Sequence, residues 1–284
     1  MEKGTIGLSK VITAICFVSL SIMLAPQANA ALISTVSQTR TTSAYLDFQT
    51  INGDKAGDSK NGSATNFGVF NSTVTANTIA TTNYCRRTGC YLMEAGSGTA
   101  TGSQNSEIAA SSILANGSAS WNVSSGWLVA VFSSGGASSN FGVTFDLTQD
   151  ATFSLTGSLS NYLLYSSTSN LGSPNGQATI GLMGTSSIAY HLLDSRVSSL
   201  GSLSFSDTGQ LRAGRYTLSA AATSGGSDYN MTNNGNSSYS FQLTLTPTPV
   251  PLPGALWLLI SGISLISAAG LRRKTTVASS VSGT

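Results

Sequence analysis

The feature that most constrains the fold of this 284-residue chain is a period-2 alternation of apolar with small or polar residues. The alternation is clearest in 141–147 and returns, after a short connection, in 151–156. Residues 216–220 and 241–245 alternate in the same way. Because successive side chains of a strand point to opposite faces, each segment is predicted to be a half-buried β-strand. We expect 141–147 and 151–156 to pair as a hairpin.

Weaker alternation recurs along the chain, whereas no window from 31 to 246 carries a convincing apolar stripe with the period of a helix. Residues 107–114 nevertheless fit one short helix. Frequent Gly, Ser and Asn are typical of short strands joined by turns. The chain is therefore predicted to be all-β, an antiparallel β-sandwich of jelly-roll-like kind or else an irregular barrel. The weaker candidate strands are 44–51, 67–75, 90–95, 127–133, 178–183, 187–193 and 202–206.

Low-complexity stretches separate several of these candidates. They lie at 96–106, 133–139 and 223–238 and consist mainly of Gly, Ser, Thr, Ala and Asn. Such composition favours surface loops, and we predict loops there.

The C-terminal region combines three features in a fixed order. Val250, Pro251, Leu252 and Pro253 precede an apolar run, 254–271, which Arg272, Arg273 and Lys274 close. The eighteen residues of that run would span about 27 Å as a helix, close to the roughly 30 Å of a hydrocarbon core. We therefore predict one transmembrane helix, with the basic cluster on the cytoplasmic side.

This order of Pro-containing tetrad, short apolar helix and basic cluster resembles the PEP-CTERM sorting signal of bacterial exported proteins. The resemblance implies that an exosortase recognises the segment and cleaves near the tetrad, so that the helix is a transient membrane anchor. The chain departs from the family pattern at Leu252, where the namesake motif has Glu, and in the polar tail at 275–284. The alternative is an ordinary C-terminal membrane anchor.

The N-terminus predicts export. Lys3 and Lys10 form a positive n-region, 11–24 is apolar, and Ala28 and Ala30 form a small-x-small cleavage site ahead of Ala31. The Sec translocon and signal peptidase are the partners that such a segment implies. Cleavage before Ala31 would place the following residues outside the cytoplasmic membrane, and exosortase cleavage would release them to the cell surface or the medium.

These signals divide the chain into five predicted parts. They are a signal peptide at 1–30, a β-sandwich ectodomain at 31–246, a Pro-rich stalk and tetrad at 247–253, a transmembrane helix at 254–271, and a basic cluster with a cytoplasmic tail at 272–284.

The charge of the ectodomain excludes some partners. Between 31 and 246 there are eight basic and ten acidic residues, so the net charge is −2. Charged residues make up only 8% of the chain, against roughly 25% in typical domains. The ectodomain has no strong positive electrostatic field that would attract nucleic acid, so we do not predict that it binds nucleic acid. A hydrated, nearly uncharged surface suits surroundings rich in exopolysaccharide.

Two cysteines remain after removal of the signal peptide, in which Cys16 follows Ile15 and does not fit a lipoprotein site. Cys85 and Cys90 are separated by four residues that include a Thr-Gly turn. In an oxidising envelope this pair is predicted to form a disulfide.

Catalytic and metal-binding candidates are few. His191 is the single histidine, and a structural role is favoured. Asp146 and Asp150 flank a predicted turn, and we interpret them as turn residues rather than as a glycosidase pair. The loop 52–58 could offer oxygen ligands to Ca²⁺ but lacks the acidic ladder of an EF-hand. Neither a metal nor another cofactor is predicted.

Two further features bear on glycan binding. Trp121 and Trp127, with Tyr229 and Tyr239, could stack on sugar rings, although aromatic residues of a sandwich are more often core. The segment 211–218, in which Gly214 precedes an aromatic residue, resembles a turn of secreted jelly-roll and carbohydrate-binding modules, and we interpret it as a core turn.

Two functions follow from these observations. The first is a non-catalytic envelope or extracellular-matrix protein, delivered by an exosortase and taking part in biofilm or exopolysaccharide assembly. The second is a carbohydrate-binding module, and a secreted hydrolase is a distant third.

Overall fold

The computed structural model describes residues 32–126, 131–167, 175–194, 201–229 and 231–249. These residues form β-strands and no helix, which confirms the predicted all-β class. The strands are β1 (Ile33–Thr50), β2 (Lys55–Ser63), β3 (Phe70–Arg86), β4 (Gly89–Ile108), β5 (Ser112–Ser125), β6 (Val131–Leu147), β7 (Ala151–Ser167), β8 (Asn175–Met183), β9 (Ser187–Asp194), β10 (Gly201–Leu211), β11 (Gly214–Tyr229) and β12 (Met231–Pro247).

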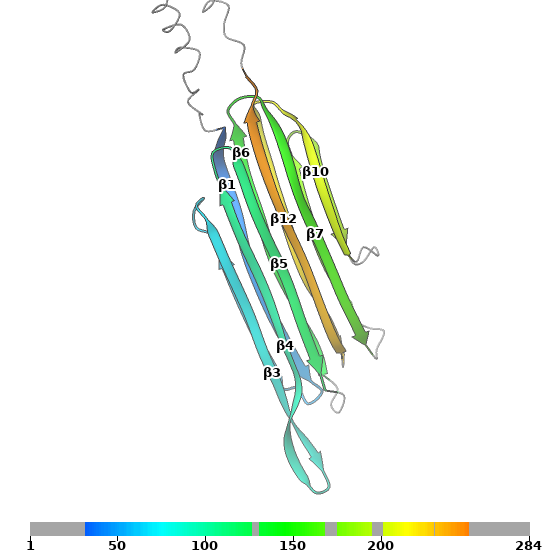
Figure 1. Ribbon diagram of the computed structural model, residues 1–284. Helices are drawn as coiled ribbons and strands as arrows, with labels where there is room; N and C mark the ends of the chain where they lie inside the picture. The colour runs from blue at the N-terminus through cyan, green and yellow to red at the C-terminus, as the bar shows by residue number, and fades with distance from the viewer. Residues whose placement is uncertain (1–31, 127–130, 168–174, 195–200, 230, 250–284) are drawn as a thin grey trace, which may run out of the picture. The chain divides into compact units, whose positions relative to one another are not determined.

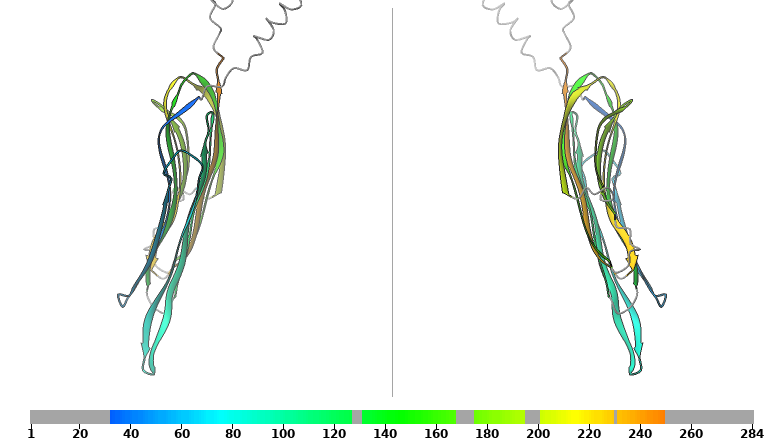
Figure 2. Two further views of the ribbon diagram at one scale, coloured as in Figure 1. Left: turned by 90° about the vertical axis from the view of Figure 1, so that its left-hand side faces the viewer. Right: turned by 90° about the vertical axis from the view of Figure 1, so that its right-hand side faces the viewer.

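The strands form two antiparallel sheets that pack face to face as a β-sandwich (Figure 1). Sheet A has the order β2-β1-β6-β11-β8-β9, and sheet B has the order β10-β7-β12-β5-β4-β3. The two layers are visible edge-on in Figure 2. The chain changes sheet repeatedly, since β5 in sheet B is followed by β6 in sheet A, β7 in sheet B and β8 in sheet A.

The predicted hairpin of 141–147 with 151–156 is wrong. These segments are parts of β6 and β7, which lie in opposite sheets, so the connection between them crosses the sandwich instead of turning within a sheet. β6 pairs with β1 and β11, and β7 pairs with β10. Alternation identifies a strand with one buried face, but it does not identify the partner.

The three low-complexity stretches are strands and not the predicted loops. Residues 96–106 lie in β4, 133–139 lie in β6, and 223–238 lie in β11 and β12 apart from residue 230, which is outside the described residues. As a result, the strands are longer than expected, up to 20 residues in β4. The predicted short helix at 107–114 is also wrong, because β4 ends at Ile108 and β5 begins at Ser112.

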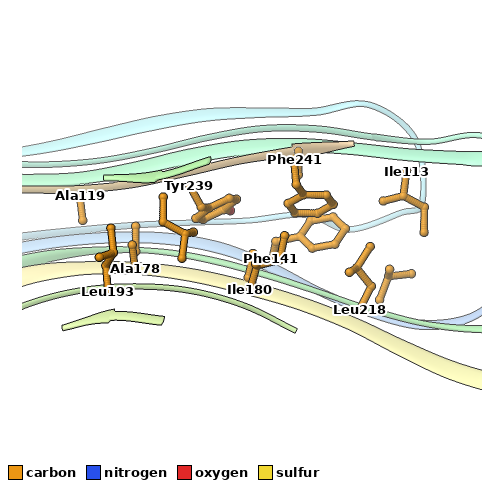
Figure 3. Packing of buried hydrophobic residues seen from close by; sticks show 14 of the residues in the cluster. Ile113, Ala119, Phe141, Ala178, Ile180, Leu193, Leu218, Tyr239 and Phe241 are labelled. Carbon is orange, nitrogen blue, oxygen red and sulfur yellow. The ribbon is translucent and has the colours of Figure 1, made fainter. Parts of the chain in front are cut away.

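Large apolar side chains fill one part of the sandwich interior. The ring centroids of Phe141 and Phe241, from opposite sheets, lie 5.4 Å apart in an edge-to-face contact. Ile180 and Leu218 of sheet A and Ile113 of sheet B are buried in the same layer (Figure 3). This part of the core is where the period-2 pattern was clearest in the sequence.

Small residues fill another part, where the two backbones come close. A Cβ atom on Gly102 of β4 would lie 2.6 Å from the carbonyl oxygens of both Ser43 and Ser138, which belong to the opposite sheet. The interior here also holds polar groups, as the Tyr239 hydroxyl and Ser139 Oγ share a 3.2 Å hydrogen bond. Burial raises the pKa of Tyr239 above its ordinary value.

Arg40 is a buried cation on β1 that binds the segment connecting β2 and β3. Its guanidinium donates to the carbonyl oxygens of Asn66 and Gly68, the latter at 2.7 Å, and to Ser106 Oγ at 3.3 Å. These bonds hold the connection between β2 and β3, and burial lowers the pKa of the Arg40 side chain. The alternation pattern did not indicate this role, since a charged residue occupies an inward position.

The β3–β4 hairpin extends beyond its neighbours and ends in a disulfide (Figure 1). Cys85 and Cys90 are directly opposite in the strand register, with Cα atoms 4.0 Å apart, and they are bonded as predicted. Gly89 has a φ of 139°, a conformation that glycine adopts readily at the turn.

The chain divides into two compact units, 1–246 and 247–284. The sandwich described above belongs to the first, and most of the second lies outside the described residues. Within the described ranges, no helix has the length and apolar character needed to cross a membrane. The predicted signal peptide and the predicted helix at 254–271 both fall outside these ranges.

Candidate functional site

Several predicted site residues fall outside the described part of the chain. They are Ala28, Ala30 and Ala31 of the signal peptidase site, Trp127, and Val250, Pro251, Leu252, Pro253, Arg272, Arg273 and Lys274 of the sorting signal.

Trp121 does not present a ring face to a glycan. It lies on β5 between Ala119 and Val123, on the face turned toward the other sheet, and its side chain is 1% exposed. Tyr239 is buried as well, so of the three aromatic candidates within the described residues only Tyr229 is exposed. We therefore place no glycan contact at Trp121, which is a core residue opposite Gly235.

His191 pairs with a carboxylate from the other sheet. Its Nε2 lies 2.6 Å from Asp207 Oδ2, and its ring stacks on Phe205 with centroids 4.3 Å apart. β9 carries His191 and β10 carries the two partners, so the contact bridges the edges of sheets A and B. The arrangement fits the structural role favoured from the sequence.

Asp146 forms an ion pair, whereas Asp150 accepts a hydrogen bond from a turn. Arg215 donates to both carboxylate oxygens of Asp146, at 2.8 and 2.9 Å, and this pairing lowers the pKa of Asp146. Asp150 accepts a 2.8 Å bond from the backbone N–H of Ala213. Asp150 thus supports the turn between β10 and β11, in which Gly214 has a φ of 155° and the Tyr216 hydroxyl donates to Arg212.

The segment 52–58, predicted as a loop, comprises the β1–β2 turn and the start of β2, and its acidic side chains accept hydrogen bonds from protein donors. Asp54 accepts from the Thr82 hydroxyl at 2.8 Å, which ties the β1–β2 turn to β3 in the opposite sheet. Asp58 accepts from the backbone N–H of Asn77 and lies 3.2 Å from Lys60. In the described ranges, no three His, Cys, Asp or Glu residues come together as they would around a metal ion.

An open groove lies on the outer face of sheet A. It encloses about 500 Å³ and runs over β1, β6, β11 and the start of β8. We call it the sheet A groove, and its lining residues are Ser43, Tyr45, Phe132, Ser134, Gly136, Ala137, Ser138, Asn175, Thr223, Ser224, Gly225, Gly226 and Ser227.

The strand register explains why the face is hollow at this point. Tyr45, Gly136, Gly225 and Asn175 form one row across four strands. The two central positions are glycines and carry no side chain, whereas Tyr45 and Asn175 stand at the two sides of the row. A Cβ on Gly136 would lie 3.2 Å from Cε1 of Tyr45, so the tyrosine ring leans over that glycine.

Hydroxyl groups flank the glycine floor. Ser43 and Ser138 share a 2.8 Å hydrogen bond, and Thr223 follows them in the same row. Aromatic rings close one end, where Phe132 and Tyr229 are cross-strand partners with centroids 5.2 Å apart. The groove thus combines hydrogen-bonding groups with exposed ring surface.

Sequence reasoning missed the sheet A groove, although one signal was available. Tyr45 stands between the inward-facing Ala44 and Leu46, so the alternation itself directs this large aromatic side chain to the solvent. It is 49% exposed. A tyrosine in the polar phase of a strand is a stronger indication of a surface site than a tryptophan in the apolar phase, which is how Trp121 is placed.

No protein-family model, no curated protein and no solved structure matches this chain.

Proposed function

We propose that this chain is a non-catalytic protein of the bacterial cell envelope or extracellular matrix, exported and then sorted by an exosortase. The observation that carries the proposal is the order of the C-terminal features, with Pro251 and Pro253 ahead of an apolar run and a basic cluster after it. An unprocessed anchor has no need of the tetrad. A signal peptide at the other end of the chain agrees with export.

The composition of the apolar run supports a transient anchor. Nine of its eighteen residues are Gly, Ala or Ser, and these contribute less transfer free energy than Leu or Ile. Small residues also permit close approach of a partner helix, as recognition within the membrane would require. The helix is thus suited to a short stay in the bilayer.

The sandwich supports a structural role. Within the described residues, His191 and Asp207 join the edges of the two sheets, and Arg215 pairs with Asp146 across neighbouring strands. The Cys85–Cys90 disulfide suits an oxidising compartment. As a finer class we propose a jelly-roll-like sandwich, because consecutive strands from β5 to β8 alternate between the sheets.

The processing of the native protein tests the proposal. Intact mass measurement of protein from the native host should show a chain that begins at Ala31 and has lost the segment 272–274. Replacing Pro251 and Pro253 with Ala should leave an uncut, membrane-bound form, as should deletion of the exosortase. The matched control replaces Pro247 and Pro249, which lie just before the tetrad, and should be cut normally. Wild-type protein that retains Thr284 would show a plain anchor and end the sorting proposal.

A further inference from the structure

The sheet A groove has the chemistry of a neutral oligosaccharide site. Hydroxyl side chains dominate its lining, and each hydroxyl both donates and accepts hydrogen bonds. Sugars present the same groups in return. A sugar ring also has an apolar face of C–H groups, which packs against an aromatic ring such as that of Tyr45.

The charge of the groove narrows the class of ligand. None of the thirteen described residues that line it carries a charge. The carboxylate of Asp47 lies in the neighbouring row, since Asp47 is the register partner of Ser134. A uronic acid or sulfated polymer would meet this negative charge with no lining cation to offset it.

The shape of the groove fits a chain-like ligand. Its floor at Gly136 and Gly225 crosses the central strands of the sheet, so the hollow is bounded by Tyr45 on β1 and by Asn175 on β8. Side chains added at these glycines would fill it. Gly225 is moreover packed against the neighbouring backbone, where a Cβ would lie 2.7 Å from the carbonyl oxygen of Gly135.

We propose that the sheet A groove binds a neutral polysaccharide, with Tyr45 stacking on a sugar ring and Ser138 and Thr223 contacting its hydroxyls. The inference rests on the function proposed above and names the matrix component that the exported protein holds. The groove replaces Trp121, which is buried, as the candidate site for a glycan.

Affinity gel electrophoresis of the full chain tests the inference, in a polyoxyethylene detergent, which contains no sugar. The gels would contain dextran, laminarin or galactomannan as neutral probes and alginate as an anionic probe. We expect at least one neutral polymer to retard the wild-type protein, and alginate to have no effect.

Two substitutions on β11 locate the site. Thr223→Arg places a long side chain in the groove and should weaken binding at least tenfold. Ser219→Arg is the matched control, because Ser219 lies on the same strand and face but outside the groove, and it should bind like the wild type.

Substitutions of tyrosine separate stacking from general surface effects. Tyr45→Ala should weaken binding about tenfold, whereas Tyr45→Phe should retain most of it because the ring remains. Tyr190→Ala, an exposed tyrosine elsewhere on sheet A, should have no effect. Circular dichroism of every variant would verify that it is folded.

The outcomes are separable from those of the processing experiment. Equal retardation of the Thr223→Arg and Ser219→Arg proteins, retardation by alginate alone, or no retardation by any neutral polymer would each overturn the groove assignment. These results would leave cleavage at the tetrad untouched. Conversely, binding by a protein that retains Thr284 in its native host would end the sorting proposal and keep the groove.

Discussion

The two halves of β6 pair with the same neighbours, β1 and β11, yet they are packed by different means. In the half that contains 141–147, Phe141, Val143 and Phe145 fill the space between the sheets. In the half that contains 133–139, the inward positions are small, and Gly102 of the opposite sheet comes within van der Waals reach of the β6 backbone.

The interior of one sandwich is thus aromatic and apolar at one place, and narrow and partly polar at another. Large side chains stabilise by removing apolar area from water, at about 25 cal/mol per Å². The small inward residues of β6 contribute little area themselves. This half is therefore stabilised by close packing, by larger side chains of β1 such as Leu46 and Phe48, and by hydrogen bonds such as that between Ser139 and Tyr239. The aromatic half should therefore be destabilised most by a loss of side-chain volume, and the half with small residues by added volume.

The largest effect is expected from removing volume in the aromatic half. Phe241→Ala should lower the free energy of unfolding by about 3–5 kcal/mol, because it leaves a cavity beside Phe141. Urea denaturation followed by tryptophan fluorescence measures the change. Tyr91→Ala, at an exposed position of the β3–β4 hairpin, is the control and should change stability by less than about 0.5 kcal/mol. Equal effects at the two positions would show that the Phe141–Phe241 contact does not stabilise the core.

Adding volume should be damaging in the thin half. Gly102→Ala would place a methyl group 2.6 Å from two backbone oxygens of the opposite sheet, and we expect a loss of about 1–3 kcal/mol. Gly142→Ala is the matched control, since its Cβ would find its nearest atom at an ordinary 3.6 Å. The same denaturation measurement applies. A neutral Gly102→Ala protein would show that the sheets are not in close contact there.

The polar interior predicts a smaller effect that depends on pH. Tyr239→Phe removes the hydroxyl that bonds Ser139 and should cost about 1 kcal/mol at neutral pH. Burial raises the pKa of Tyr239, so the fold favours the neutral phenol. The stability it contributes is present below the ordinary pKa of about 10 and is lost as the pH rises above that value. Stability measured from pH 8 to pH 11 should thus fall more in the wild type than in the Phe variant, and parallel curves would contradict this.

The smallest effect is expected at the surface of the aromatic half. Arg215→Gln should return the lowered pKa of Asp146 toward its ordinary value, which a carboxylate titration by NMR would detect. Because the folded-state pKa is depressed, the contribution of Asp146 is present above its ordinary pKa and is lost as the pH falls through the folded value. The pair is exposed, and we expect no measurable change in stability at neutral pH. A clear loss of stability at neutral pH would show that the ion pair, as well as packing, stabilises this half.

The sequence was informative where side chains are large. The segments 141–147, 216–220 and 241–245 were identified as strands because their inward residues are bulky and apolar, and each lies in a strand. The sequence misled where side chains are small. Residues 133–139 were predicted to be a loop, because Ser and Gly are compatible with either face of a strand and produce no alternation.

The candidate site was misplaced for a related reason. An aromatic residue in a sequence rich in Ser and Gly suggests a contact surface, but only the phase of the strand decides which face it occupies. Trp121 lies in the apolar phase and is core, whereas Tyr45 lies in the polar phase and borders the groove. The alternation along each strand shows which face Trp121 and Tyr45 occupy. The row that joins Tyr45 to Gly136 and Gly225, however, depends on the order of the strands in the sheet.

Local composition and short spacing were enough to predict the all-β class and the disulfide between Cys85 and Cys90, and they also carry the export and sorting proposals. The placement of β6 and β7 in opposite sheets and the extension of strands through glycine-rich segments depend on contacts between distant parts of the chain. The tertiary structure alone also brought Tyr45, Gly136 and Gly225 into one row. The physical reason is that pairing between distant strands follows from the fit of whole surfaces, which the alternation along a single strand does not encode.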